Sequence, residues 1–270
     1  MSNTSPKPAD PSGALRAYMF LDGLVRLFLW VSSLALTVAL FTALGLWPEQ
    51  SLIGADLATA WSWGVRLALA VVVYNVIYVV HLVILRAPLP TPKEGYYRLD
   101  GGNDANPQLL WAALSSTLLR AKYEPPFPGF LVSHLINLPP LHWLVNRIVG
   151  PKSRSCFVLN PLIPDPSHTE FGRNVTIGNM TSVIAHVHNR DGITLKKTVV
   201  EDDVMIGAHS LIYCGCTIKR GAVVYGGSVV RPDTVIGENE AWGGVPARKI
   251  KDLPPLDAAG HDDGNTWVGA

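Results

Sequence analysis

Two histidines, His186 and His188, stand at the start of a polar stretch, HNRDGITLKKT, that interrupts a regular sequence pattern. An imidazole has a pKa near 6.5, so either histidine suits the role of general base toward an attacking hydroxyl or amine. On a strand, two residues this far apart would point to the same face. Asp191 and Glu170 are carboxylates that could orient the imidazole. Equally, all four side chains could be solvated polar groups at the base of a loop.

The interrupted pattern has a period of six residues. A small or β-branched residue follows most of the large apolar positions four residues later, and these two positions share a face of a strand. Glycines directly after an apolar position suit tight turns, where a Cβ is costly; they are Gly172, Gly178, Gly207 and Gly237. The large apolar positions are Phe171, Ile177, Val183, Val200, Ile206, Ile212, Ile218, Val224, Val230, Ile236 and Trp242.

A repeat of six residues is typical of a parallel β-helix, in which each hexad forms one side of a triangular coil. A β-sandwich would instead show alternation at period two, with irregular spacing between its turns. The pattern therefore predicts a mainly β domain, a parallel β-helix, over residues 157–250. An inserted loop in such a solenoid commonly marks its functional face, which places the candidate site at residues 186–198.

The hexads resemble a known family. FGRNVT, IGNMTS and MIGAHS, with the ending WGGVPARKI, are similar to the hexapeptide-repeat acyltransferases, which include sugar O-acetyltransferases and serine acetyltransferases. TEFGRNVTIG and SVIAHVHNRDG also resemble membrane-linked acyltransferase-like segments at the end of some peptide synthetases. The resemblance covers the hexad region only. It implies a left-handed β-helix, a homotrimer, and transfer of an acyl group, acetyl-CoA being the expected donor.

The resemblance also implies roles for individual residues. His186 takes the place of the histidine of the synthetase-linked segments, whereas HNRD is similar to a His-x-x-Asp stretch of the sugar acetyltransferases and favours His188. The closing stretch resembles one that lies against CoA, where small residues admit the pantetheine chain and cations hold the phosphates. A basic cap that closes the solenoid is the alternative. The expected CoA-binding residues are Gly243, Gly244, Pro246, Ala247, Arg248, Lys249 and Lys251.

Two other functions fit parts of the pattern. His186, His188 and His209 raise the possibility of zinc, as in carbonic anhydrases of β-helix architecture, but their spacing differs from the pattern of that family, so no metal is expected. A non-catalytic scaffold in a membrane complex is the second alternative. Binding or hydrolysis of acetyl-CoA separates these functions.

The first third of the chain is strongly apolar. The 270 residues carry a net charge of +1, which leaves no basic surface for nucleic acid. Residues 27–48 hold no charge, and Leu67–Leu85 is a second apolar run bounded by Arg66 and Arg86. A helix needs about 20 apolar residues to cross a bilayer, so the sequence predicts a transmembrane hairpin at 27–86. A pair of buried core helices is the alternative.

The flanks of the two runs predict an orientation. Lys7, Arg16 and Arg26 precede the first run and Arg86 and Lys93 follow the second, while the connecting loop is acidic. The positive-inside rule then places both termini and the β domain in the cytoplasm, at the inner (cytoplasmic) membrane of the cell. The cysteines Cys156, Cys214 and Cys216 form no CxxC pair, which favours a reducing compartment. An anchored site suggests a lipid-linked or envelope glycan, or another small acceptor, which the sequence does not identify.

The remaining segments complete the expected organisation. Residues 1–26 are a tail and flank, 87–156 a linker with amphipathic helices, and 251–270 a flexible tail. Within the linker, residues 108–123 and 130–149 have helical apolar spacing. These helices could lie at the membrane interface or cover the β-helix as a lid.

Overall fold

The computed structural model describes residues 12–98, 107–136, 138, 145, 148, 152–158, 162–190 and 192–255. The chain divides into two compact units. The first contains the described residues of Met1–Lys152, Pro164–Ser167 and His188–Thr194, and the second those of Ser153–Ile163, His168–Val187 and Leu195–Ala270. The helices are α1 (Ser12–Ala43), α2 (Leu57–Arg86), α3 (Pro107–Tyr123) and α4 (Val132–Ile136), with short 3-10 turns η1 (Gly129–Leu131) and η2 (Pro166–His168).

The strands are short except for β3, and most belong to the second unit. They are β1 (Gly95–Arg98), β2 (Lys152–Val158), β3 (Thr169–Ile177), β4 (Ser182–Val183), β5 (His186–His188), β6 (Gly192–Leu195), β7 (Thr198–Val200), β8 (Met205–Ile206), β9 (Leu211–Ile212), β10 (Thr217–Ile218), β11 (Val223–Val224), β12 (Val229–Val230), β13 (Val235–Ile236), β14 (Glu240–Gly244) and β15 (Ala247–Asp252).

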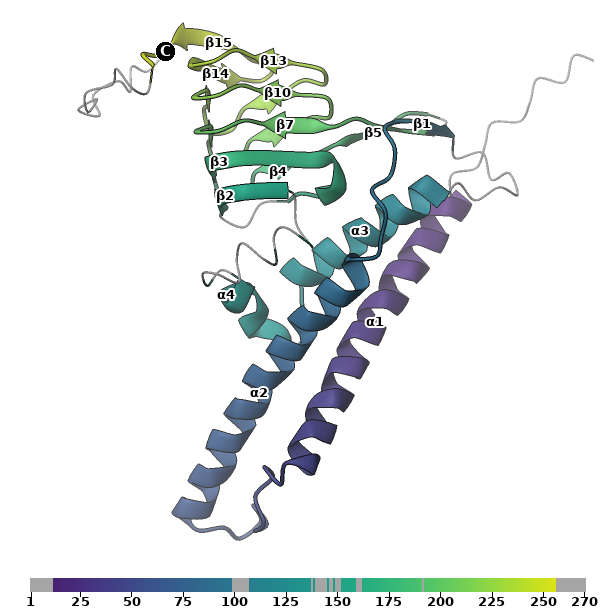
Figure 1. Cartoon of the computed structure of the whole chain (residues 1–270), viewed down its shortest axis with the longest axis vertical. Helices are drawn as coiled ribbons and strands as arrows, with labels where there is room; N and C mark the ends of the chain where they lie inside the picture. The colour runs from purple at the N-terminus through teal and green to yellow at the C-terminus, as the bar shows by residue number, and fades with distance from the viewer. Residues whose placement is uncertain are drawn as a thin grey trace, which may run out of the picture. The chain divides into compact units, whose positions relative to one another are not determined.

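Two long helices, α1 and α2, lie side by side in the first unit (Figure 1). Asp56 caps α2 by accepting a hydrogen bond from the amide of Thr59 at 2.8 Å. Ser33 Oγ and His81 Nδ1 join the two helices at 2.8 Å. Both helices are long and apolar enough to cross a membrane. Helix α1 begins at Ser12, so it includes much of the segment that hydropathy assigns to the tail and flank.

The shorter helices α3 and α4 pack against α2. Helix α3 confirms the helix predicted at residues 108–123. Helix α4 is a single short helix within the apolar stretch that follows. Leu29 of α1, Tyr78 of α2, Leu118 of α3 and Val132 of α4 meet in one buried cluster, which removes their apolar surface from water. The Tyr78 hydroxyl lies 3.1 Å from the carbonyl oxygen of Ala121 and donates to it.

In the second unit, each short strand pairs in parallel with the strand three hexads later. Val199 pairs with Thr217, and Thr217 pairs in turn with Val235. The same spacing relates β8, β11 and β14 on a second face, and β9 and β12 on a third. Strand β4 also pairs with β9, but over a longer separation that includes the interruption of the repeat. Figure 1 shows the resulting stack of three-sided coils. Strand β3 runs along two faces, pairing with β7 and then β8, and β2 pairs with β3.

The large apolar positions of the hexads fill the interior of the stack. From Phe171 to Ile236 they are at most 3% exposed, which confirms the register derived from the sequence. Trp242, on the last coil, is half-buried instead. Small residues fill the corners, and their hydroxyls are satisfied by the backbone; Thr181 Oγ1, for example, donates to the carbonyl of Gly207 at 2.9 Å.

The turns differ from the expectation for glycine. The left-handed backbone falls two residues after the expected glycine position, where Asn174, Asp203 and His209 have φ between 54° and 62°. The glycines directly after the apolar positions are required for another reason. A Cβ on Gly178 or Gly207 would overlap the backbone of the adjacent coil, at Ala208 and Gly226 respectively. These glycines therefore permit close stacking. The left-handed turn position is occupied by polar residues in some hexads and by Gly215, Gly221 and Gly227 in others.

Candidate active site

The interruption of the repeat is a β-hairpin made by β5 and β6. The Lys196 amide donates to the carbonyl of Ala185 at 2.9 Å, where the chain leaves and re-enters the coil. At the far end, the Asn189 amide donates to the carbonyl of Gly192 at 2.8 Å and closes the turn. The hairpin therefore leaves and re-enters the coil at adjacent positions, and its role as the site stays a prediction.

The structure brings His186 and His188 together on β5. His186 is half-buried and directly follows the buried Ala185, whereas His188 is exposed and precedes the turn. The base of the hairpin is also held by Thr198 Oγ1, which donates to the carbonyl of Ile184 at 3.1 Å. His186 therefore lies where the hairpin leaves the packed coil, whereas His188 lies nearer the exposed turn.

The two carboxylates predicted to orient the histidine are Asp191 and Glu170. Asp191 lies outside the described residues. Glu170 lies on β3, where its Oε2 is 2.7 Å from Nζ of Lys197. An orienting role for either residue stays a prediction.

A third strand, β1, pairs with the outer edge of β6. A Cβ on Gly192 would lie 2.5 Å from the carbonyl oxygen of Tyr97 and 2.7 Å from the phenol of Tyr96, so only glycine allows this approach. The sequence places β1 in a linker. The adjacent tyrosines, which favour strands, were the available signal among neighbouring prolines and glycines.

The closing stretch forms an antiparallel hairpin, in which β15 pairs back onto β14 of the last coil. Gly243 pairs with Arg248 and Gly244 with Ala247, while the Val245–Pro246 turn is exposed. A Cβ on Gly243 would lie 2.9 Å from Ile250 Cδ1, so the glycine allows the two strands to close together. Lys251 also belongs to β15, which therefore includes the beginning of the expected flexible tail.

The basic residues of this hairpin are not equivalent. Lys249 Nζ lies 2.8 Å from Glu240 Oε1 and 2.6 Å from Asp252 Oδ1. Hydrogen bonds from Lys249, from the Trp242 indole and from the Gly237 amide lower the pKa of Glu240 to about 2. Arg248 and Lys251, by contrast, have no ion pair within the described part of the chain.

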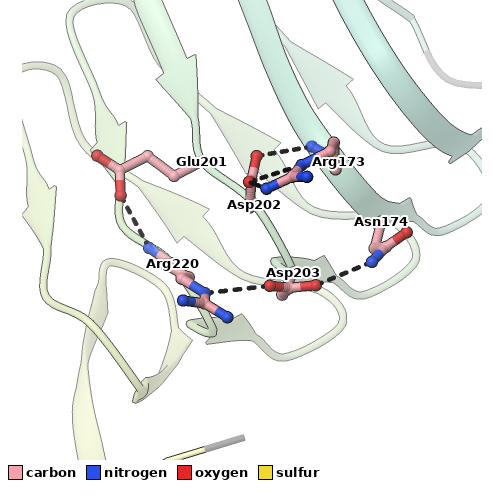
Figure 2. A network of polar contacts seen from close by, with 6 residues as sticks. All are labelled: Arg173, Asn174, Glu201, Asp202, Asp203 and Arg220. Atoms are coloured by element: carbon pink, nitrogen blue, oxygen red, sulfur yellow. Dashed lines mark hydrogen bonds and ion pairs between the residues drawn. The ribbon is translucent and has the colours of Figure 1, made fainter.

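Another charged cluster lies at a corner shared by successive coils, shown in Figure 2. Arg173 binds the Asp202 carboxylate through Nε and Nη2 at 3.1 and 3.0 Å, and Arg220 Nε contacts Asp203 Oδ2 at 3.1 Å. Asn174 Nδ2 donates to the other oxygen of Asp203 at 3.1 Å. These ion pairs and hydrogen bonds join residues of successive coils and so stabilise the turns at this corner.

The remaining candidate groups give no metal site. His209 is exposed at a left-handed turn, as a surface histidine would be. Cys214 and Cys216 are buried, and burial raises the pKa of the Cys216 thiol to about 11. Among the residues that the structure describes, no three His, Cys, Asp or Glu side chains gather to hold a metal ion.

Comparison with known proteins identifies the family. Over 130 residues, the chain is 33% identical to the putative acetyltransferase YvoF of Bacillus subtilis, a match that covers 45% of this chain and 74% of YvoF. It is also 36% identical over 80 residues to a 2,3,4,5-tetrahydropyridine-2,6-dicarboxylate N-acetyltransferase of Staphylococcus aureus, which covers 30% of this chain and 31% of that protein. The chain belongs to the hexapeptide-repeat acetyltransferases, and it is therefore an acyltransferase that depends on acetyl-CoA.

Two other matches have a β-helix relative and a solved structure. The mitochondrial gamma carbonic anhydrase 2 of Arabidopsis thaliana is 35% identical over 85 residues, which are 32% of this chain and 26% of that protein. The hexapeptide-repeat acetyltransferase VCA0836 of Vibrio cholerae, solved with acetyl coenzyme A, has a TM-score of 0.41 at 22% identity, covering 56% of this chain and 91% of that one. No protein-family model matches the chain.

Proposed function

We propose that the protein is a membrane-anchored acetyltransferase that moves an acetyl group from acetyl-CoA to a hydroxyl or amine of an envelope glycan or another small acceptor. One observation carries this proposal. A chain of the acetyltransferase family has a regular stack of coils that is interrupted once in its described part, and the interruption is a hairpin carrying two histidines. Imidazole is the side chain that general base catalysis at neutral pH most often uses.

His186 is the favoured base. It removes a proton from the acceptor hydroxyl or amine as that group attacks the thioester carbonyl, which gives a tetrahedral oxyanion. Backbone N–H groups near the hairpin are suited to stabilise this charge. Collapse of the intermediate breaks the carbon–sulfur bond and releases the CoA thiolate, which receives the proton. Its place beside the buried Ala185 supports His186 over His188, because a base must keep its position relative to the reacting atoms.

The closing hairpin is the proposed CoA site. Gly243, Gly244, Pro246 and Ala247 present little side-chain bulk, which admits a narrow pantetheine chain. Arg248 and Lys251 supply cations for the phosphates. Lys249, grouped with them on sequence grounds, has the weaker claim because its charge contacts both Glu240 and Asp252.

The assembly proposed is a homotrimer of left-handed β-helices. The parallel pairing of strands three hexads apart supports a β-helix, and the family supports its hand and the trimer. The exposed apolar faces of α1 and α2 support a two-span anchor in the inner membrane. The basic flanks support a position of the catalytic unit on the cytoplasmic side, where acetyl-CoA is found.

Two histidine variants test the proposal. In purified full-length enzyme, His186→Gln is expected to lower kcat by on the order of 10²-fold or more, the usual loss when a general base is removed. His188→Gln keeps the bulk and polarity of its side chain and serves as the matched variant, with a smaller loss. Release of the CoA thiol from acetyl-CoA gives the rate. Wild-type rates for both variants would remove histidine from the chemistry.

A second measurement separates the enzyme from a scaffold. CoA is expected to raise the melting temperature of the full chain in detergent, because a ligand that binds only the native state stabilises it. A chain that gains no stability from CoA and releases no thiol from acetyl-CoA would support a non-catalytic scaffold.

A further inference from the structure

The turn between α3 and α4 contacts the middle of α2. Asn75 Nδ2 donates to the carbonyl oxygen of Pro128 at 3.0 Å, and the position that a Cβ on Gly129 would take lies 3.8 Å from the ring of Tyr74. Asn75 lies about midway between Arg66 and Arg86, the charged residues that bound the apolar run. At 1.5 Å per residue, Asn75 is about 16 Å from Arg86 along the helix axis, about half of a 30 Å hydrocarbon core. If α2 crosses the bilayer, the turn at Pro128 lies within the hydrocarbon.

The outer surface of the turn is aromatic. Phe127 is 80% exposed and Phe130 55% exposed, with ring centroids 6.3 Å apart. Val72 and Val76 of α2 are also exposed large apolar residues. Side chains of this kind are expensive to leave in water and are suited to lipid.

The backbone of the turn suits an apolar environment as well. Pro125, Pro126 and Pro128 have no amide N–H, so this stretch brings few hydrogen-bond donors that need a partner. The Gly129 amide donates to the carbonyl of Pro126 at 2.6 Å, and the Pro128 carbonyl accepts from Asn75. In return, the turn supplies a partner for a polar side chain that lies in the middle of an apolar helix.

Charged groups mark where the insertion begins. Glu124 Oε2 lies 3.2 Å from Arg26 Nη1 and 3.8 Å from Arg120 Nη2. Asp22 Oδ1 is 3.9 Å from Arg120 Nη1, and Asp22 Oδ2 is 3.9 Å from Arg26 Nη1. These four residues close the last turn of α3 against α1, directly before the uncharged segment 125–133. Because these charges pair with one another, they can lie close to lipid at a lower cost than unpaired charges.

We propose that residues 125–136 form a re-entrant turn that inserts into the cytoplasmic leaflet, with Phe127 and Phe130 packed against phospholipid acyl chains. The inference rests on the proposed membrane anchor. It adds that the anchor is more than two spans, because α3 descends to the membrane surface and the turn enters it. The segment thereby fixes the depth of the first unit in the leaflet through the hydrogen bond from Asn75 to Pro128.

Site-specific photocrosslinking tests the proposal. The photoreactive residue p-benzoylphenylalanine replaces Phe127 or Phe130 in the full chain, reconstituted in vesicles of phosphatidylethanolamine and phosphatidylglycerol. Leu69, an exposed residue of α2, is the reference for the span, and Val235, an exposed residue of β13, is the control outside the first unit. After irradiation, mass spectrometry measures phospholipid adducts, and phospholipase C then removes headgroups.

Positions 127 and 130 are expected to form adducts at about the yield of position 69, and on the order of tenfold above position 235. The adducts should keep the diacylglycerol mass after phospholipase C, because acyl chains are the partner. Adducts at position 69 alone would overturn the re-entrant turn and leave the anchor intact. Adducts at 127 and 130 that retain only headgroup mass would also overturn it. A lack of adducts at position 69 as well would overturn the anchor with it.

Discussion

At the scale of single residues, two neighbouring basic side chains of the closing hairpin, Arg248 and Lys249, have different contacts. Lys249 contacts Glu240 and Asp252, and so contributes to closing the last coil. Arg248 Nη1 donates to the carbonyl of Ala247 at 3.2 Å, and among the residues that the structure describes its charge has no ion pair, so we expect it to contact a phosphate. The family resemblance predicts the same CoA-binding role for both residues, but their contacts in the structure favour this role for Arg248 alone.

Alanine variants should show this separation. Arg248→Ala is expected to raise the KM for acetyl-CoA by about tenfold, since a hydrogen bond to a charged group contributes about 1.5–3 kcal/mol. Lys249→Ala should lower the melting temperature with less effect on KM. Steady-state kinetics and thermal unfolding on the same preparations measure both quantities. A larger KM change for Lys249→Ala would reverse the assignment.

The charge of Glu240 predicts a dependence of stability on pH. Its pKa falls from an ordinary value of 4.5 to about 2 in the folded chain, chiefly through Lys249. A lowered folded pKa means that this stability is complete above pH 4.5 and is lost as the pH falls toward 2. Glu240→Gln should therefore reduce the free energy of unfolding at pH 7 by about 1–3 kcal/mol. Urea unfolding at pH 7 and pH 3 tests this, and an unchanged difference at pH 3 would contradict it.

At the scale of elements, the sheet β1-β6-β5 joins the segment after α2 to the hairpin that carries the histidines. The pairing of β1 with β6 requires glycine at position 192, because a side chain there would overlap Tyr97 and Tyr96. The linker therefore contributes a strand that holds the outer edge of the hairpin. Strand β1 is in this sense a positioning element for the candidate site.

Gly192→Val should separate β1 from β6 and lower kcat by several-fold, because the hairpin loses its third strand. Trypsin should then cut more rapidly after Lys93 and Arg98, which flank or end β1. Gly64→Ala, where no atom lies within 4 Å of the new Cβ, is the matched control with wild-type activity and cleavage. Unchanged cleavage in Gly192→Val would show that the pairing does not depend on this glycine.

At the scale of the whole molecule, the proposed anchor makes a topological prediction. Gln50 lies in the loop between α1 and α2, which the positive-inside rule places outside the cytoplasm. In a Cys156→Ser background, Gln50→Cys should react with a membrane-impermeant maleimide in intact spheroplasts. The parent without this cysteine is the control, since Cys214 and Cys216 are buried. Labelling that requires lysis would place the loop inside.

The sequence by itself determined the coil register and the location of its interruption. Period-six spacing follows from burial on one face of each strand. Buried residues such as Ile206 and Ile218 can therefore be predicted from the neighbouring sequence alone. The two apolar helices were equally visible, because helix length and apolar composition are local properties. His186 and His188 could also be identified from the sequence, because they lie where the six-residue repeat is interrupted.

Only the tertiary structure decided which groups meet across long separations in the chain. The glycines after the apolar positions are explained by contact with the next coil, and Gly192 by contact with Tyr97, neither of which has a local signal. Lys249 differs from Arg248 because Glu240 and Asp252 lie beside it. The turn at Pro128 reaches Asn75 through packing of α3 and α4 on α2. Such contacts depend on three-dimensional proximity, which a one-dimensional pattern of residue types does not encode.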